Sequence, residues 1–171
     1  KLDVPGSVYL STASHVDLGQ TGRFDAAHPE NSVLSSAAPS AFGFLAQKPA
    51  TITVNGSALN ATEGKTLSLS AGNIQLNNGR LQANSGRIEL VGVVWADKVI
   101  FAPLGILLDS KASLGAVHLE DASSLSVGKQ GGGNIFIRSG EFVMSNSALI
   151  ANSSQDADGG VISIQAESLL L

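Results

Sequence analysis

The chain has 171 residues, of which 43% are hydrophobic and only 14% are charged, and its formal net charge is −4. This length allows one domain with a sizeable core or a short repeat array. The negative charge argues against a nucleic-acid partner, because phosphates are bound by clustered Lys and Arg. The absence of cysteine excludes disulfides, thiolate catalysis and cysteine-ligated zinc.

The first 50 residues divide into two regions. Residues 1–24 contain short apolar–polar alternations separated by Gly6, Gly19 and Gly22, a pattern typical of short strands. Over residues 25–50 the periodicity is lost and three prolines occur among Ala and Ser. We predict that this second region is a loop excursion from the main body.

Regular alternation begins at residue 51 and continues to the end of the chain. Similar pairs of apolar residues return at variable offsets: Leu67 and Leu69 return 21 positions later, and Val117 and Leu119 return 18 positions later. Strands that stack directly above one another tolerate such variation, because the turns between them can lengthen outward. The pattern predicts short stacked strands over residues 51–171.

The segment 131–171 contains the clearest repeat. Two glycines followed by an alternating apolar pair occur at residues 132–137 and again, 27 positions later, at residues 159–164. A period of this length marks stacked supersecondary units, and a unit with strands and no helix indicates a parallel β-helix. Its inward-facing side chains are predicted to form a ladder along the axis. The predicted ladder comprises Ile88, Leu90, Val117, Leu119, Ile135, Ile137, Ile162 and Ile164.

Chemically reactive residues are scattered. The aspartates lie near predicted strand ends at irregular spacing and do not form the acid pair that a polysaccharide-active β-helix enzyme needs, so we predict no catalytic residue. Clustered carboxylates at residues 156–160 invite a calcium site, but the glycine–aspartate nonapeptide of calcium-binding β-rolls is absent, which favours a solvated turn. His15, His28 and His118 lack a second ligand at metal spacing. We expect no metal and no cofactor.

Two aromatic residues are candidates for surface contact. Strict alternation places Phe136 outside, between two inward isoleucines, and Trp95 lies in an apolar segment near a predicted strand end. Exposed rings would stack on sugar rings, which would suit a glycan-binding surface. For Phe136 the favoured interpretation is that a loop outside the coil, or a neighbouring chain, covers the ring.

Two segments resemble a known family. TLSLSAGNIQLNNGRLQANSGRIELVGV (66–93) and GGGNIFIRSGEFVMSNSALIANSSQDADGGVISIQA (131–166) resemble the filamentous-haemagglutinin family. These are large exoproteins of two-partner secretion, built as right-handed parallel β-helices and exported through a dedicated outer-membrane barrel. KLDVPGSVYLSTASHVDLG (1–19) is similar to the closing part of the family's N-terminal secretion domain, and SAAPSAFGFL (36–45) is similar to the loop that follows it.

The resemblance implies a fold, a function and partners. The expected fold is a right-handed parallel β-helix with residues 1–24 as the end of a secretion-domain-like region, 25–50 as an extra-helical loop, and 51–171 as coils truncated at both ends. The expected function is that of a secreted adhesin or extracellular fibre component at the cell surface of a Gram-negative bacterium. The expected partners are the outer-membrane transporter barrel and a host-surface or glycan receptor.

Two departures from the family pattern add a further expectation. The family's Asn-Pro-Asn-Gly element is absent, and Leu171 stops within a coil, so we expect a piece of a longer protein whose open coil ends favour self-association. The alternatives are a self-assembling filament subunit and a polysaccharide-active β-helix enzyme.

Overall fold

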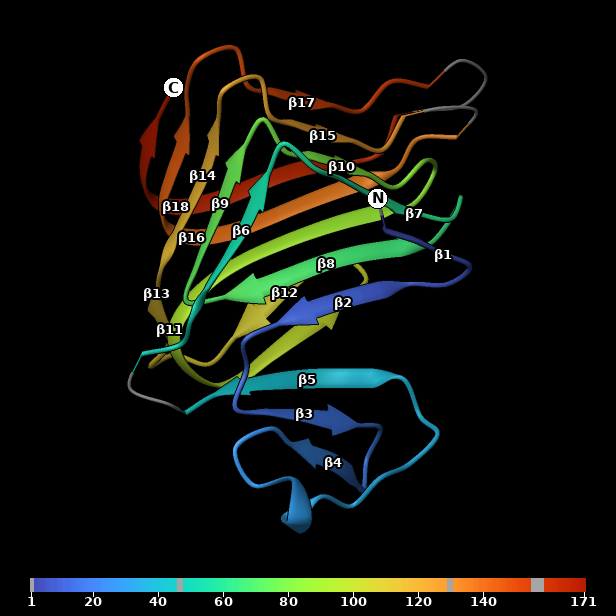
Figure 1. The fold of residues 1–171 in the computed structure, drawn as a ribbon, viewed down its shortest axis with the longest axis vertical. Helices are drawn as coiled ribbons and strands as arrows, with labels where there is room; N and C mark the ends of the chain where they lie inside the picture. Colours follow the sequence, from blue (N-terminus) through green and yellow to red (C-terminus); the bar gives the residue numbers. More distant parts are fainter. Residues whose placement is uncertain (1, 46–47, 129–130, 155–158) are drawn as a thin grey trace.

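The computed structural model describes residues 2–45, 48–128, 131–154 and 159–171, and the fold is all-β (Figure 1). Within these ranges the one helical element is a single 3-10 turn, η1 (Pro29–Asn31). No helix in the described part of the chain has the length and apolarity that crossing a membrane requires.

Most strands belong to three stacks of parallel strands, in which each strand pairs with the strand of the preceding and following pass of the chain. Stack A contains β1 (Leu2–Val4), β7 (Ala58–Ala61), β10 (Arg80–Gln82), β15 (Ser124–Ser126) and β17 (Leu149–Ala151). Stack B contains β2 (Val8–Ser11), β8 (Thr66–Ala71), the first part of β11 (Arg87–Ala102), the first part of β16 (Asn134–Met144) and the first part of β18 (Ile162–Leu170). Stack C contains β6 (Thr51–Asn55), β9 (Asn73–Asn77), β14 (Ala116–Glu120) and the second parts of β16 and β18.

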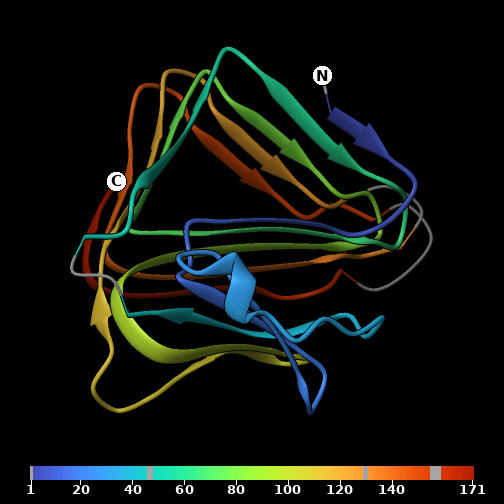
Figure 2. The same ribbon diagram turned by 60° about the horizontal axis from the view of Figure 1, so that its bottom comes forward.

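The chain visits the stacks in the repeated order A, B, C, so that each pass adds one strand to each stack. Figure 2 shows the stacks as three sides around a common interior. Alternate residues of all three stacks point into that interior, as the two-residue period of a strand requires. The resulting core includes Leu81 and Leu125 from stack A, Ile135 from stack B, and Ile74 and Phe142 from stack C.

Corners between stacks depend on close backbone contact or on left-handed backbone. At the entrance to stack B, a Cβ on Gly160 would lie 2.0 Å from the Gly133 carbonyl oxygen, and a Cβ on Gly133 would lie 2.5 Å from the Gly86 carbonyl oxygen. Only glycine fits where the backbone of one pass of the chain lies directly on that of the next pass. At the corner after stack C, Asn78 and Asn146 have positive φ, a conformation that asparagine tolerates better than most residues.

A second, antiparallel sheet lies outside stack B, and we call it the side sheet. It consists of the second part of β11 with β5 (Pro39–Phe44), β3 (His15–Leu18) and β4 (Gly22–Asp25), in the order β4-β3-β5-β11. The second part of β11 also pairs with β12 (Gly105–Leu108) and β13 (Ser113–Leu114). A separate apolar cluster that includes Phe42, Phe44, Val91 and Val99 joins the side sheet to the outer surface of stack B.

The predicted segment boundaries need three corrections. β1 and β2 pair within stacks A and B, so the parallel stacks already include strands from residues 1–24 and this region is no separate unit. The expected loop over residues 25–50 contains β5, whose phenylalanines are buried in the side-sheet cluster. Residues 98–108, expected to be coil strands, instead form the antiparallel β11–β12 hairpin outside the three stacks.

Candidate ligand-binding site

Strand register in the side sheet brings four residues into one row. Asp17 on β3 pairs directly with Arg23 on β4 and with Ala41 on β5, and Ala41 pairs with Ile100 on β11. Directly paired residues lie on the same face of a sheet, and Lys98, two positions before Ile100, joins that face. Residues far apart in the sequence therefore share one surface, whereas the opposite face packs on stack B.

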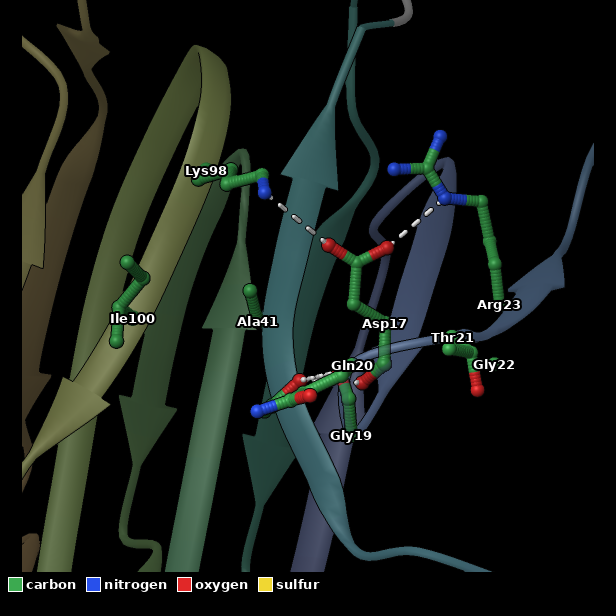
Figure 3. Close-up of a pocket in the computed structure, with 10 residues that line it drawn as sticks. Asp17, Gly19, Gln20, Thr21, Gly22, Arg23, Ala41, Lys98 and Ile100 are labelled. Carbon is green, nitrogen blue, oxygen red and sulfur yellow. Dashed lines mark hydrogen bonds and ion pairs between the residues drawn. The ribbon is translucent and has the colours of Figure 1, made fainter. Parts of the chain in front are cut away.

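The Asp17 carboxylate lies between two cationic side chains. Its Oδ1 is 2.8 Å from the Arg23 Nε, and its Oδ2 is 3.8 Å from the Lys98 Nζ. Figure 3 shows the two cations on opposite sides of the carboxylate, with the terminal nitrogens of Arg23 directed away from Asp17. The Asp17 side chain is 14% exposed, whereas Arg23 and Lys98 are 50% and 52% exposed. Both cations are thus held in place while they remain open to a ligand.

These residues line a pocket of about 530 Å³. This volume falls within the roughly 300–1,000 Å³ of small-ligand sites. Polar groups of the β3–β4 turn and of β5 form part of the wall, and Ala41 and Ile100 form an apolar part. The lining residues are Asp17, Gly19, Gln20, Thr21, Gly22, Arg23, Ser40, Ala41, Lys98 and Ile100.

Hydrogen bonds from Ser40 fix the turn that borders the pocket. The Ser40 hydroxyl is 3.0 Å from the Gly19 carbonyl oxygen and 3.2 Å from the Asp17 carbonyl oxygen, and it donates to this pair. Gly19 has φ +68°, a left-handed conformation that closes the turn. The turn is therefore anchored to β5, and the exposed Gln20 and Thr21 are carried at the edge of the pocket.

His15 packs beside the pocket row and does not open into it. Its ring covers Gly43 so closely that a Cβ there would lie 1.9 Å from the His15 Cε1 atom. Burial and the nearby Arg23 charge lower the pKa of His15, although Asp17, Asp97 and Asp25 oppose the change. The side chain is therefore a neutral packing residue at neutral pH.

The charges of the pocket favour an anionic ligand. It carries two positive charges and one negative charge, on a chain whose formal net charge is −4. Acid–base cleavage of a glycosidic bond generally uses two carboxyl groups, and the pocket contributes one, which is already paired with Arg23. An anion is the ligand that two half-exposed cations attract.

A buried ion pair fixes the hairpin next to this pocket. The Arg87 Nε contacts the Glu89 Oε1, and the Arg87 side chain is 16% exposed and that of Glu89 only 2%. The terminal guanidinium nitrogens of Arg87 donate to the carbonyl oxygens of Ala102 and Pro103 at 2.6 and 2.7 Å. The guanidinium also lies 4.2 Å from the centre of the Phe136 ring. Arg87 therefore ties the β11–β12 hairpin to the outer surface of stack B.

Burial also perturbs the acids around this ion pair. Desolvation raises the pKa of Glu89, and the Arg87 charge and a hydrogen bond with Ser68 oppose the rise. Desolvation, with the Glu89 charge, raises the pKa of Tyr9. The Tyr9 ring packs 6.2 Å from that of Phe42, so it belongs to the cluster beneath the side sheet.

In the structure, most residues of the predicted ladder pair with one another across adjacent strands of stack B. Ile135 pairs with Ile162 at the predicted offset of 27 residues, and Ile88 pairs with Ile135. Leu90, Ile137 and Ile164 form the neighbouring rung, and Leu67 and Leu69 pair with Ile88 and Leu90 as their offset indicated. Ile162 and Ile164 are 44% and 37% exposed, because β18 pairs on one side only in the described chain.

The predicted pairing of the 18-residue offset is wrong. Val117 pairs with Ile74 and Phe142 in stack C, and Leu119 pairs with Leu76 and Met144. Ile135 and Ile137 lie in stack B. The two pairs look alike because both are inward-facing, but they lie on different sides of the same core.

Of the two aromatic candidates for surface contact, Phe136 is covered, as the interpretation of an overlying loop predicts, and Trp95 is half-buried. Phe136 is 4% exposed, because Arg87 and the β11–β12 hairpin cover it, so its ring cannot stack on an external sugar. Trp95 is half-buried on β11 and pairs with Ser113 of β13. Neither residue lines the side-sheet pocket.

The remaining candidates do not converge. His118 lies 2.8 Å from Glu141 on the outer surface of stack C. Within the described ranges no group of three His, Asp or Glu residues could hold a metal ion. Residues 156–158 of the possible calcium turn lie outside the described residues.

Sequence reasoning missed the pocket, although part of its signal was present. In the sequence, Asp17 is one of several scattered aspartates near predicted strand ends, and Lys98 interrupts an apolar segment. Asp17 and Lys98 lie close together because β5 lies between β3 and β11 in the side sheet. The two residues are 81 positions apart in the sequence, and an alternating pattern does not show which distant strands pair in an antiparallel sheet. Arg87 and Glu89 could have been found, because alternation places both outward on the same strand face.

Comparison of the chain with family models, with curated proteins and with solved structures finds no match.

Proposed function

We propose that this chain is part of a secreted adhesin, a right-handed parallel β-helix that carries its binding surface on the side sheet. The repeated order of stacks A, B and C supports the helical coil, because each pass returns to the same three sides with its register preserved. A coil of this kind is a quasi-one-dimensional rod whose passes contact only their neighbours.

The observation that carries the functional proposal is the placement of the side sheet. β3, β4 and the second part of β11 leave the coil, yet β8, β11 and β16 keep uninterrupted parallel pairing beneath them. The additional strands do not complete the core and instead expose a charged pocket on an outward face. A rigid scaffold that carries loops and short strands with convergent polar groups is a common basis for recognition.

We propose the route and location from the sequence resemblance. The segments 66–93 and 131–166 resemble exoproteins of two-partner secretion. An outer-membrane transporter barrel is accordingly the proposed export partner, and the outer surface of a Gram-negative bacterium is the proposed location. A binding role without catalysis fits the single paired carboxylate of the pocket.

The test is direct binding of the purified chain. A fluorescently labelled sample would be applied to an array of neutral and acidic glycans and to epithelial cell layers, beside an unrelated β-rich protein of similar charge. We expect saturable binding to at least one of these surfaces. Binding no greater than that of the control protein on both would overturn the adhesin proposal.

Deletion of residues 25–50 is not a suitable control for this test. Phe42 and Phe44 are buried between the side sheet and stack B, so their removal would expose that cluster. Point substitutions of half-exposed pocket residues leave the cluster intact and are preferable.

A second candidate function is self-assembly, which the exposed edge of β18 favours. Ile162, Leu169 and Leu170 of this strand are 44%, 58% and 64% exposed. An unpaired apolar edge strand is a template for another strand, and here the proposed occupant is a second copy of this chain. Leu170→Lys should abolish association in sedimentation velocity, whereas Leu104→Lys, at a 93% exposed position of the hairpin, should not. A wild-type monomer at every dilution would exclude this candidate.

A further inference from the structure

We infer that the side-sheet pocket binds a saccharide that carries a carboxylate, such as a hexuronate unit of a polysaccharide. The inference rests on the proposed binding function and names the ligand class of the same pocket. The pocket combines two half-exposed cations with a net charge of +1, which a ligand with one negative charge would neutralise. It also has a turn with hydrogen-bonding side chains and a small apolar wall.

Charge selects a monoanion. Arg23 and Lys98 contribute two positive charges, and Asp17 contributes one negative charge, so the pocket has a net charge of +1. A single carboxylate neutralises this charge, whereas a doubly charged phosphate monoester would leave a negative excess beside Asp17. Neutral sugars would leave the outer faces of both cations without an anionic partner.

The geometry of Arg23 selects a planar anion. Asp17 engages the Nε of Arg23 at 2.8 Å, and Figure 3 shows the two terminal nitrogens directed away from that bond. The fork of a guanidinium matches the two oxygens of a carboxylate and forms two parallel charge-assisted hydrogen bonds. Asp17 therefore acts as a positioning residue that orients the guanidinium, and Arg23 and Lys98 are the expected contacts to the ligand.

The remaining pocket wall suits the rest of a sugar ring. Gln20 and Thr21 at the turn provide an amide and a hydroxyl, which can donate to and accept from ring hydroxyl groups. Ile100, which is 39% exposed, provides an apolar surface for the C–H groups of the ring. A pocket with a few convergent polar groups and an apolar wall fixes both the orientation and the identity of a small ligand.

The experiment compares ligands that differ only in the anionic group. Oligosaccharides that end in glucuronate, glucose or glucose 6-sulfate would be titrated against the full chain, with chemical-shift changes as the readout. The glucuronate ligand should bind, and its affinity should fall as salt is raised, because the cations are exposed. The glucose ligand should bind at least about tenfold more weakly, since charged hydrogen bonds are lost.

Variants of the two cations identify the site. Arg23→Gln should weaken glucuronate binding by about tenfold or more, and Arg23→Lys should lose part of that affinity because the charge remains without the fork. Lys98→Gln should have a smaller effect than Arg23→Gln. Lys65→Gln, at an exposed position outside the pocket, makes the same charge change and should bind as the wild type does. Thermal unfolding of each variant checks that the fold is retained.

The outcomes separate this inference from the adhesin proposal. Equal binding of glucose and glucuronate, tighter binding of the sulfate ester, or wild-type affinity of a folded Arg23→Gln protein would overturn the carboxylate assignment. Any of these results leaves adhesion intact if the chain still binds glycans or cells. No binding to any glycan or cell surface overturns both.

Discussion

Replacement of Arg87 by methionine should strongly destabilise the fold, because it leaves Glu89 charged and buried without its partner. Loss of one member of a buried ion pair costs about 3–5 kcal/mol, and the partial exposure of Arg87 favours the lower end of about 3 kcal/mol. For a urea m-value of about 2 kcal/mol/M, the unfolding midpoint should fall by about 1.5 M. Arg87→Lys should recover little, since an ammonium does not span the same carbonyl oxygens.

The cost should also depend on pH. Burial raises the folded-state pKa of Glu89 above its ordinary value of 4.5, so the folded state holds this proton more tightly than the unfolded state does. The contribution of Glu89 to the free energy of unfolding therefore falls as pH rises from 4.5 through the raised pKa. Loss of the Arg87 charge raises that pKa further. The destabilisation by Arg87→Met should accordingly be larger at pH 8 than at pH 4.5.

Urea denaturation at both pH values, followed by circular dichroism, is the assay. Arg80→Met provides the matched control, because Arg80 is exposed on stack A and should cost less than about 0.5 kcal/mol. The double replacement of Arg87 by Met and Glu89 by Leu should recover much of the loss, since it removes the unpaired charge. Equal destabilisation at the two pH values, with no recovery in the double variant, would refute the assignment of the effect to the buried charge.

Three further predictions concern the core, a corner and the side sheet. Ile135→Ala should cost about 2–5 kcal/mol in urea unfolding, whereas Ile162→Ala, at a 44% exposed position of the same ladder, should cost clearly less; equal costs would contradict the stack assignment. Gly86→Ala should lower the melting temperature, because its Cβ would lie 2.2 Å from a backbone oxygen of the adjacent coil, whereas Gly159→Ala meets nothing within 4 Å and should not. The pKa of His15 is lowered from 6.5, so wild-type stability should fall as pH drops from 6.5 toward that lower value, and His15→Gln should remove this component; parallel pH–stability profiles of the two proteins would contradict it.

The sequence by itself determined most strands of the three parallel stacks and much of their stacking. Alternation identifies inward positions because a strand has a two-residue period, and the 27-residue repeat places Ile162 on Ile135. The same signal could not assign Val117 to stack C, because inward-facing aliphatic residues look alike on every side of a shared core. The local pattern therefore shows which face of a strand points inward, but it does not show which strand lies next to it.

Only the tertiary structure decided the side sheet and its pocket. Asp17 and Lys98 approach to 3.8 Å because β5 lies between their strands, and that antiparallel pairing leaves no periodic trace in the sequence. For Phe136, alternation places the ring on the outer face and favours cover by a loop, but only the packing identifies Arg87 and the β11–β12 hairpin as that cover. The two-residue period shows which side chains of a strand point inward and which point outward. A binding pocket also depends on which distant segments pack against that strand, and the period does not show this.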